Sequence, residues 1–413
     1  MESVIAQDIP TAPGGRTATM SEIQISPAGA HDIAFETFGD PAALAHLWRA
    51  FETDAAGHVF QTYDYVAAWV RHVAAARGIE PRIVVARAGS GRLLAILPLG
   101  VGRRMGVRVL SWLGGDQSDY HCGLFDRAFL AGLHDDPAAA EAFRRAAVAA
   151  ASAGADVVRF TRQPAAIDGL SNPFAGPGAL DHASQAHETR LEGSFEAYYT
   201  AKRGKSSRRI DKRKLDKLTS LGPLRLVDAT DPGEIRRIMA ALVAMKRDSL
   251  AARGISDIFG EPGVRDFYEA IAQTAAAGGP AHVAALYCGD DIAACSWGLV
   301  HGRRYYYVLH TYAGGEIGRC SPGKHLMYHL MQWAIARGVD AFDFTVGDEP
   351  YKAEWCEVSQ PLRDTVASLS ARGSGLAMAL HAGATAKRVI KTTPILWRGA
   401  EALRRRLGPV AAG

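Results

Sequence analysis

The chain has 413 residues, of which 48% are hydrophobic and 22% are charged, and its formal net charge is +4. This composition excludes a disordered or fibrous chain and predicts a globular protein of two domains. The mild positive charge does not by itself indicate a nucleic-acid-binding protein. The five cysteines form no CxxC pair, and no stretch approaches the ~18 apolar residues of a membrane span, so we expect a cytoplasmic protein.

The first half of the chain predicts helices followed by a sheet. Residues 1–30 are small and polar, and we expect a disordered leader without the apolar core of a signal peptide. Apolar residues at helical spacing predict one or two helices within 35–78. Three apolar stretches separated by glycine turns, at 82–87, 93–100 and 107–113, predict an antiparallel meander. A helix over 137–153 and a strand over 157–161 follow.

The second half repeats this plan. A second predicted meander covers 283–288, 292–300 and 303–311, and its glycine turns recur about 200 positions after those of the first. The segment GADVVRFT (154–161) matches GVDAFDFT (338–345). We therefore predict two α/β units with mixed sheets, related by internal duplication, at 31–190 and 191–370, and a basic helical tail at 371–413.

The stretch Gly318–Lys352 is the most informative, and it reads as loop, helix, strand and polar loop. Ser321 is expected to cap a helix whose first residue is Pro322. Because a helix N-terminus attracts anions, we predict phosphate binding there. The predicted phosphate-binding residues are Arg319, Ser321, Gly323 and Lys324. The same features would also suit an ordinary capped helix.

Two segments are strongly basic. Residues 198–221 include AKRGKSSRRIDKRKLDKL, which could surround a phosphate-bearing ligand, bind tRNA, or simply form a solvated helix face. The tail at 376–407 alternates basic and apolar residues, so it could contact an anionic membrane surface peripherally or pack on the protein.

Two further chemistries are weakly indicated. His325 and His329 have the i, i+4 spacing of metal ligands, but no third ligand is evident, so we predict no metal. Cys320 at the helix start could act as a nucleophile or be a small buried residue.

Four motifs together resemble the GNAT acyltransferase superfamily, and more narrowly its CelD-type branch, which is associated with cellulose and exopolysaccharide loci and related to the FemAB transferases. They are FQTYDYVAAWVRH, GGDQSDY, CSPGKHLMYHLMQWAIARG and FDFTVGDEPYKAEW. The resemblance implies tandem GNAT-like folds, acetyl-CoA or another acyl-CoA as co-substrate, and an amine acceptor on a small molecule or polysaccharide precursor. The usual glycine-rich Q/R-x-x-G-x-G/A run is absent, and Arg319 and Gly323 supply only part of it. FemAB relatives use aminoacyl-tRNA, which is the alternative donor.

The expected chemistry is acyl transfer to a neutral amine. Asp343 or Glu349 would accept the amine proton, Tyr351 would protonate the leaving sulfur, and Lys352 would hold an anionic group. We expect substrate contacts from Asp119, Tyr120 and Asp348. Each of these residues could instead be structural. The third function left open is a scaffold without catalysis that binds CoA or an assembly enzyme of polysaccharide synthesis.

Overall fold

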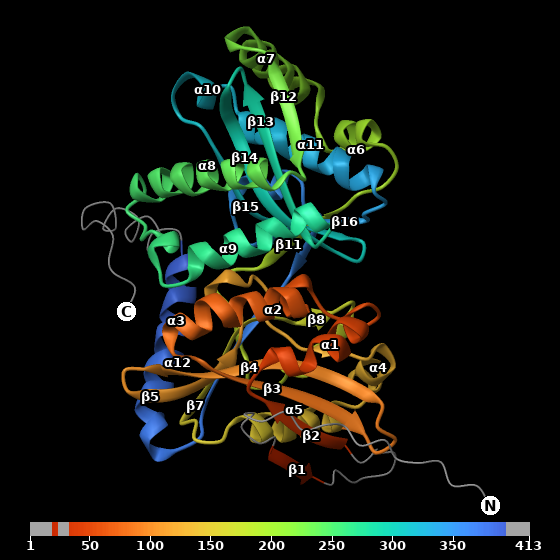
Figure 1. The fold of residues 1–413 in the computed structure, drawn as a ribbon, viewed down its shortest axis with the longest axis vertical. Coiled ribbons are helices and arrows are strands. Elements are labelled where there is room, and N and C mark those ends of the chain that lie inside the picture. Colours follow the sequence, from red (N-terminus) through yellow and green to blue (C-terminus); the bar gives the residue numbers. More distant parts are fainter. Residues whose placement is uncertain (1–18, 24–32, 394–413) are drawn as a thin grey trace, which may run out of the picture.

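The structure is a computed structural model that describes residues 19–23 and 33–393. The lower sheet in Figure 1 belongs to the first unit. Its strand order is β1-β2-β3-β4-β5-β7-β18-β10, with β6 paired to β4. The strands are β1 (Thr19–Ile23), β2 (Ile33–Phe38), β3 (Glu80–Ala88), β4 (Leu93–Arg104), β5 (Val107–Trp112), β6 (Leu124–Phe125), β7 (Val157–Pro164), β10 (Leu180–Asp181) and β18 (Leu362–Ser368). A small hairpin, β8 (Ala166–Ile167) and β9 (Leu170–Ser171), lies beside it.

The upper sheet belongs to the second unit, with the order β12-β13-β14-β15-β16-β11-β17. Its strands are β11 (Ala186–Arg190), β12 (Leu224–Ala229), β13 (Ala281–Cys288), β14 (Asp291–His301), β15 (Arg304–Tyr312), β16 (Ala341–Val346) and β17 (Val358–Gln360). β13 is buried along its whole length, as expected of a strand covered by helices on both faces.

The two units share one plan, which confirms the predicted fold class. In the first, the antiparallel meander β3-β4-β5 is followed by a helix and by β7, which runs parallel to β5. In the second, β13-β14-β15 is followed by a helix and by β16, parallel to β15. A parallel neighbour needs such a crossover helix, so the repeated turns and the repeated strand arise from one architecture.

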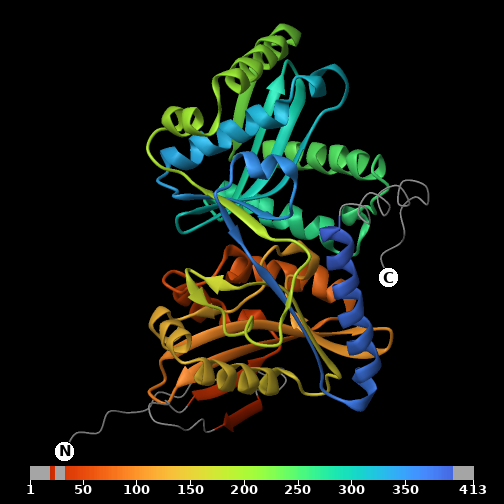
Figure 2. The ribbon, with the colours of Figure 1, turned by 180° about the vertical axis from the view of Figure 1, so that it is seen from behind.

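Helices cover both faces of the second sheet. α8 (Pro232–Ala251) and α9 (Val264–Gln273) lie over the face seen in Figure 1, and α11 (Pro322–Ala336) lies over the face seen in Figure 2. The short α10 (Gly315–Arg319) precedes α11, and α6 (Phe195–Lys202) and α7 (Lys205–Leu221) carry the basic segment. The first unit has α1 (Ala45–Glu52), α2 (Tyr63–Trp69), α3 (Ala75–Arg77), α4 (Arg127–Asp135) and α5 (Pro137–Ala151).

Two strands cross between the units. β11 lies within the range predicted for the first unit, yet it pairs with β16 and β17 of the second sheet. β18 lies within the range predicted for the second unit, yet it pairs with β7 and β10 of the first. No single chain position therefore separates the two sheets.

The units also share a hydrophobic core. α2 packs on α9, with the rings of Tyr65 and Phe267 5.1 Å apart and perpendicular. The backbones meet closely, because a Cβ placed on Gly263 would lie 2.0 Å from the carbonyl oxygen of His72. Gly263 also has φ +73°, so only glycine fits this contact without strain.

The two ends of the chain depart from the predictions. Thr19–Ile23 of the predicted leader form β1, and Ile33–Phe38 at the start of the predicted helical region form β2. The rest of the leader lies outside the described residues. α12 (Ala371–Thr392) begins the predicted tail and runs along the first unit towards the second (Figure 2). Its Lys391 bonds Asp348, at 2.7 Å, so this cation faces the protein. The tail beyond residue 393 is outside the described residues.

Candidate active site

The edge between β15 and β16 is the first part of the candidate site. These parallel strands pair at three positions near their starts, Arg304–Ala341, Tyr305–Phe342 and Tyr306–Asp343. β15 then continues to Tyr312 and β16 to Val346, and within the described residues no further pair joins them. The strands therefore diverge, and the free edge of β15 can accept an extended ligand by backbone hydrogen bonding.

A buried carboxylate lies where the divergence begins. Asp343 on β16 is 2% exposed, and its Oδ1 accepts hydrogen bonds from the Tyr120 hydroxyl and from the Thr345 N–H, both at 2.7 Å. Nη1 of Arg304 lies 3.1 Å from its Oδ2. Tyr120 belongs to the first unit, so this carboxylate links the two units. Burial and the nearby carboxylate raise the pKa of Tyr120 well above its usual value, which keeps the phenol protonated as a donor.

Aromatic side chains surround this carboxylate on the first-unit side. Nδ1 of His58 lies 3.1 Å from the Tyr306 hydroxyl, and the His58 ring packs 4.7 Å from that of Tyr120. Nε2 of His58 is buried without a hydrogen-bond partner. Burial lowers the pKa of His58 well below its usual value, so the ring is neutral. Sequence analysis did not identify His58, because its role depends on contacts with the second unit.

Asp119 lies at the same junction, next to a strained residue. Thr345 has φ +59°, which is unusual for a β-branched residue, and its side chain lowers the pKa of the nearby Asp119. Burial raises the pKa of Asp119 to about 6, although Arg162 and Thr345 oppose the shift. The Lys352 ammonium is buried below the loop and donates to the carbonyls of Thr345, at 3.3 Å, and Val346, at 3.1 Å. With a pKa of about 6, Asp119 is mostly ionised at pH 7 and can accept a proton.

Inside the divergence lie Tyr351 and two residues that the sequence analysis missed. The ring of Tyr351 is 6.3 Å from that of His310, which stacks on Tyr307 at 4.2 Å. Nδ1 of His310 is buried without a partner, and burial lowers the pKa of this ring to about 3. Lys246 donates to the His310 carbonyl at 3.3 Å, and burial lowers its pKa too. Burial raises the pKa of Tyr351, so its hydroxyl is protonated and can donate.

The predicted phosphate-binding residues lie at the start of α11, at the end of the second unit away from the junction (Figure 1). Pro322 is the first helical residue, as predicted, but the Ser321 side chain makes no capping bond. Ser321 has φ +57°, and its hydroxyl accepts from Lys214 of α7 at 2.7 Å. Lys324 lies 3.8 Å from Asp211, and Arg319 is exposed at the end of α10. Cationic side chains from three helices therefore surround this helix start.

The loop after β16 holds the last two predicted residues. Glu349 is exposed and pairs with Lys352 at 3.0 Å. Asp348 accepts from His187, at 3.1 Å, and from Lys391. Glu349 borders two adjoining cavities of about 1050 Å³ and 610 Å³ at the junction, while Asp348 borders the larger one. Both residues therefore lie beside the space between the units.

Two residues considered for other chemistries have structural partners. His329 pairs with Asp228 at 2.9 Å. Cys320 is fully buried, and its thiol donates to the Glu316 carbonyl at 3.6 Å.

Residues 205–353 match the family model of an acetyltransferase (GNAT) domain. The match covers a little over a third of the chain, and this segment is similar to a GNAT acetyltransferase domain. It contains α11, the divergence of β15 and β16, and most of the candidate site residues. The predicted branch associated with cellulose and exopolysaccharide synthesis is a finer assignment that this match does not address.

One solved structure resembles most of the two-unit fold. The crystal structure of FemX has a TM-score of 0.56 at 10% identity, covering 80% of this chain and 98% of FemX. The C-terminal domain of a putative lysylphosphatidylglycerol synthetase from Agrobacterium fabrum scores 0.47 at 14% identity, covering 83% of this chain and 95% of that domain. A tandem GNAT protein from the clavulanic acid biosynthesis pathway scores 0.38 at 13% identity, with coverages of 82% and 99%. At such identities the FemX likeness concerns the fold alone, and the two lower scores add no weight. No curated protein sequence gives a significant match.

Proposed function

We propose that the protein is an N-acyltransferase that moves an acyl group from acyl-CoA to an amine. The observation that carries this proposal is the divergence of β15 and β16 between the α11 start and the junction of the units. From Tyr306 to Tyr312, β15 spans roughly 20 Å at about 3.3 Å per residue. An elongated donor could therefore bind its pyrophosphate at α11 and extend along this edge to the junction.

The donor end combines a helix N-terminus with nearby cations. Lys214, Lys324 and Arg319 supply positive charge beside the first turn of α11, which suits pyrophosphate. Gly323 lies on the first turn, and a Cβ there would come 3.1 Å from the Tyr312 ring. A larger residue would crowd this surface, so we propose that Gly323 allows the donor to approach the backbone.

At the reacting end, Asp119 is the group whose proton affinity best suits a general base at neutral pH. The amine nitrogen attacks the thioester carbonyl, the C–N bond forms as the C–S bond breaks, and Asp119 takes the amine proton. Tyr351 donates its proton to the leaving sulfur and regains one from solvent. Asp343 was predicted as the base, but its three donors favour a positioning role, in which it orients Tyr120 and Arg304.

The acceptor would bind at the junction, beside the loop after β16, where Gly347 and Glu349 line both cavities. An amine of a small molecule or of an envelope or exopolysaccharide precursor fits the reaction proposed. In the described residues no helix is long and apolar enough to span a bilayer. Peripheral contact of the basic tail with a membrane surface is proposed separately from the acyl transfer.

Calorimetric titration with acetyl-CoA and a longer acyl-CoA tests the donor site. We expect micromolar binding, a raised melting temperature by mass action, and loss of both effects in Gly323→Glu. The matched control is Gly132→Glu, which adds the same charge to a helical glycine of α4 with open space around it. If acyl-CoA does not bind, or binds equally to Gly323→Glu and Gly132→Glu, the proposal is wrong.

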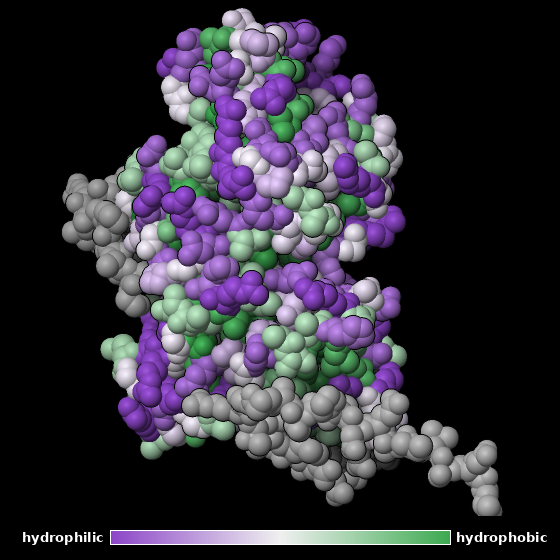
Figure 3. Space-filling view, viewed as in Figure 1, coloured by the Kyte–Doolittle hydropathy of each residue, from purple (hydrophilic) through white to green (hydrophobic). Residues whose placement is uncertain are grey.

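A second candidate is an aminoacyl-tRNA-dependent transferase, and α7 is the observation that favours it. Five of its cations are exposed: Lys205, Arg209, Lys212, Arg213 and Lys217. Hydrophilic side chains also predominate over the face shown in Figure 3, on which α7 forms one end. Titration with free tRNA at 50 and 200 mM salt distinguishes the donors. Steeply salt-dependent tRNA binding without acyl-CoA binding would favour this candidate. Binding of neither donor would favour the scaffold without catalysis.

A further inference from the structure

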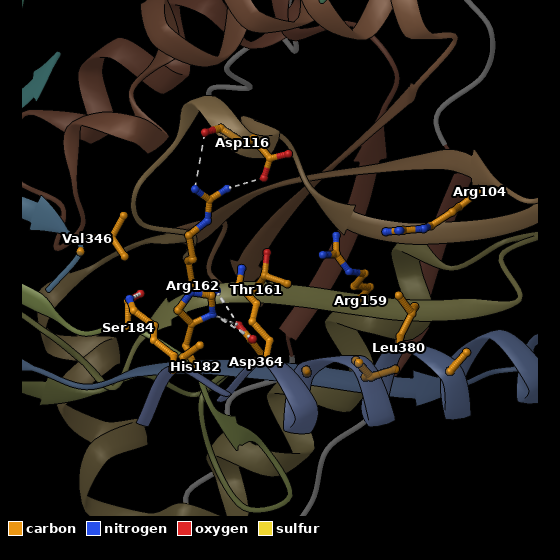
Figure 4. A pocket seen from close by; sticks show the side chains of 18 of the residues that line it. Arg104, Asp116, Arg159, Thr161, Arg162, His182, Ser184, Val346, Asp364 and Leu380 are labelled. Carbon is orange, nitrogen blue, oxygen red and sulfur yellow. Dashed lines mark hydrogen bonds and ion pairs between the residues drawn. The ribbon is translucent and has the colours of Figure 1, made fainter. Parts of the chain in front are cut away.

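The smaller cavity at the junction has a cationic lining that the proposed acyl transfer does not use. Its volume is about 610 Å³, and it lies between β7 and β18 of the first sheet, the loop after β16, and α12 (Figure 4). Five of its lining residues are arginine or lysine: Arg104, Arg159, Arg162, Lys387 and Lys391. These cations come from three separate parts of the chain, so the fold brings them together.

Three of these cations have no acidic partner within the described residues. They are Arg104, Arg159 and Lys387. The side chains of Arg159 and Arg104 approach each other in Figure 4. Burial and the Arg104 charge lower the pKa of Arg159, although Asp116 and Asp364 raise it, and the attraction of an added anion would offset both unfavourable effects.

The acidic residues that line the cavity already have partners. Asp116 pairs with Arg162 at 3.1 Å and is itself largely exposed. Glu349 pairs with Lys352. Asp364 is 8% exposed and pairs with His182 at 2.9 Å. Asp116 and Asp364 act on Arg159 only at longer range, and within the described residues no acid forms an ion pair with Arg104, Arg159 or Lys387.

One wall is held rigidly by a strained backbone. Arg162 has φ +52°, and its N–H donates to Asp364 at 2.9 Å. Its guanidinium reaches up to the Gly115 carbonyl, at 2.6 Å, and to Asp116 (Figure 4). Strained backbone that is fixed by several bonds is typical of ligand sites.

The opposite wall is α12, which presents small residues to the cavity. Ala379, Gly383 and Ala384 line it, with Lys387 one turn further along. A Cβ on Gly383 would meet no atom within 4 Å, so the space beside this glycine is open. α12 follows the matched GNAT segment, and it completes this cavity with residues of its own.

We propose that this cavity binds a phosphate group of the acceptor. Several cations around one space suit a dianion with three oxygens, and arginine pairs with phosphate by two parallel hydrogen bonds. The same cavity reaches Gly347 and Glu349 in the loop after β16, so the rest of the acceptor would extend to the junction. The binding site stands on its own geometry, and only its assignment to the acceptor rests on the proposed function.

Titration with inorganic pyrophosphate tests the site, in a Gly323→Glu background so that the donor site does not contribute. We expect saturable binding that weakens as ionic strength rises. Arg159→Gln and Lys387→Gln should each weaken it about tenfold or more, as expected for a hydrogen bond between charged groups. The matched control is Arg236→Gln, which removes an exposed cation of α8 outside the cavity.

A variant that changes no charge tests the shape of the site. Gly383→Phe fills the open space, and helix propensity favours the change, so α12 should stay folded. Weaker pyrophosphate binding in this variant, with an unchanged melting temperature, supports the site. If pyrophosphate binds equally to Arg159→Gln, Gly383→Phe and Arg236→Gln, the proposed site is wrong. It is also wrong if the protein binds citrate in preference to pyrophosphate.

The phosphate could belong to a soluble molecule or to a lipid headgroup. Sedimentation with vesicles that contain phosphatidic acid, whose phosphate is a monoester, separates these sources. Vesicle binding that is lost in Arg159→Gln, without pyrophosphate binding, identifies a lipid-borne phosphate. Binding of neither probe overturns the proposal. If pyrophosphate binds as expected while acyl-CoA does not bind the unaltered protein, the proposed function fails and the phosphate site stands.

Discussion

Removal of the Tyr120 hydroxyl is the sharpest test of how the two units are joined. Tyr120→Phe deletes the donor that lies 2.7 Å from Asp343 and leaves the ring in its aromatic surroundings. The carboxylate is 2% exposed, so water cannot readily replace the lost donor. Arg304 and the Thr345 N–H still hold the carboxylate, so it is not left without partners.

The expected loss of stability in Tyr120→Phe follows from the charge of Asp343, which accepts the hydrogen bond. A hydrogen bond to a charged group contributes about 1.5–3 kcal/mol to stability, and the two remaining donors place the expected loss near 1.5–2 kcal/mol. Tyr65→Phe is the matched control, because Tyr65 is equally buried and donates at 2.7 Å to the neutral carbonyl of Gln117 within the first unit. A bond between neutral groups contributes about 0.5–1.5 kcal/mol.

The free energy of unfolding is measured in urea, by tryptophan fluorescence, for both variants and for the unaltered protein. The difference from the unaltered protein gives the loss of stability in each variant. Tyr120→Phe should cost more than Tyr65→Phe and should also reduce turnover. A loss for Tyr120→Phe no larger than that for Tyr65→Phe would refute the reasoning that this bond is charge-assisted and links the units.

Four further outcomes are expected. If ionised Asp119 accepts the amine proton, kcat/KM should fall as pH drops below about 6, and Asp119→Asn should lower the rate about 10²-fold or more and abolish this acidic limb. Lys352→Met should lower the free energy of unfolding in urea by about 2–4 kcal/mol, because two buried carbonyls lose their donor. Glu349→Gln, which removes the exposed partner of the Lys352–Glu349 ion pair, should lower it by less than about 1 kcal/mol. Tyr351→Phe should lower kcat while leaving acyl-CoA affinity in calorimetry unchanged. Because α2 and α9 share one core, fluorescence and circular dichroism should report a single unfolding transition, and two separated transitions would contradict that interpretation.

Local sequence patterns predicted the architecture well. The glycine turns and the repeated FT strand depend on residues close together in the chain, and both meanders occur where they were predicted. Asp119 and Tyr120 were named from one motif and Asp343 from another, and the structure brings all three to one junction. Ser321 occupies the predicted N-cap position, but its hydroxyl makes no capping bond and instead accepts a hydrogen bond from Lys214 of α7.

Long-range pairing could not be predicted in this way. β11, with the sequence AHETR, is short and polar, and nothing in its pattern identifies β16 as its partner. His310 and His58 likewise acquire their unusual environments only through burial against other elements. The cationic cavity depends on Arg159 and Lys387, which are more than half the chain apart in sequence and carry no motif.

The crossing of β11 and β18 has a consequence for recombination. A chimera that replaces the second unit with that of a related protein must bring residues 186–190 with it and leave residues 362–368 behind, because each of these strands completes the other unit's sheet. A simple cut between the duplicated halves would remove the β16 neighbour from one product and the β7 neighbour from the other. The two units therefore share one plan without being interchangeable modules, and they have to be expressed and engineered together.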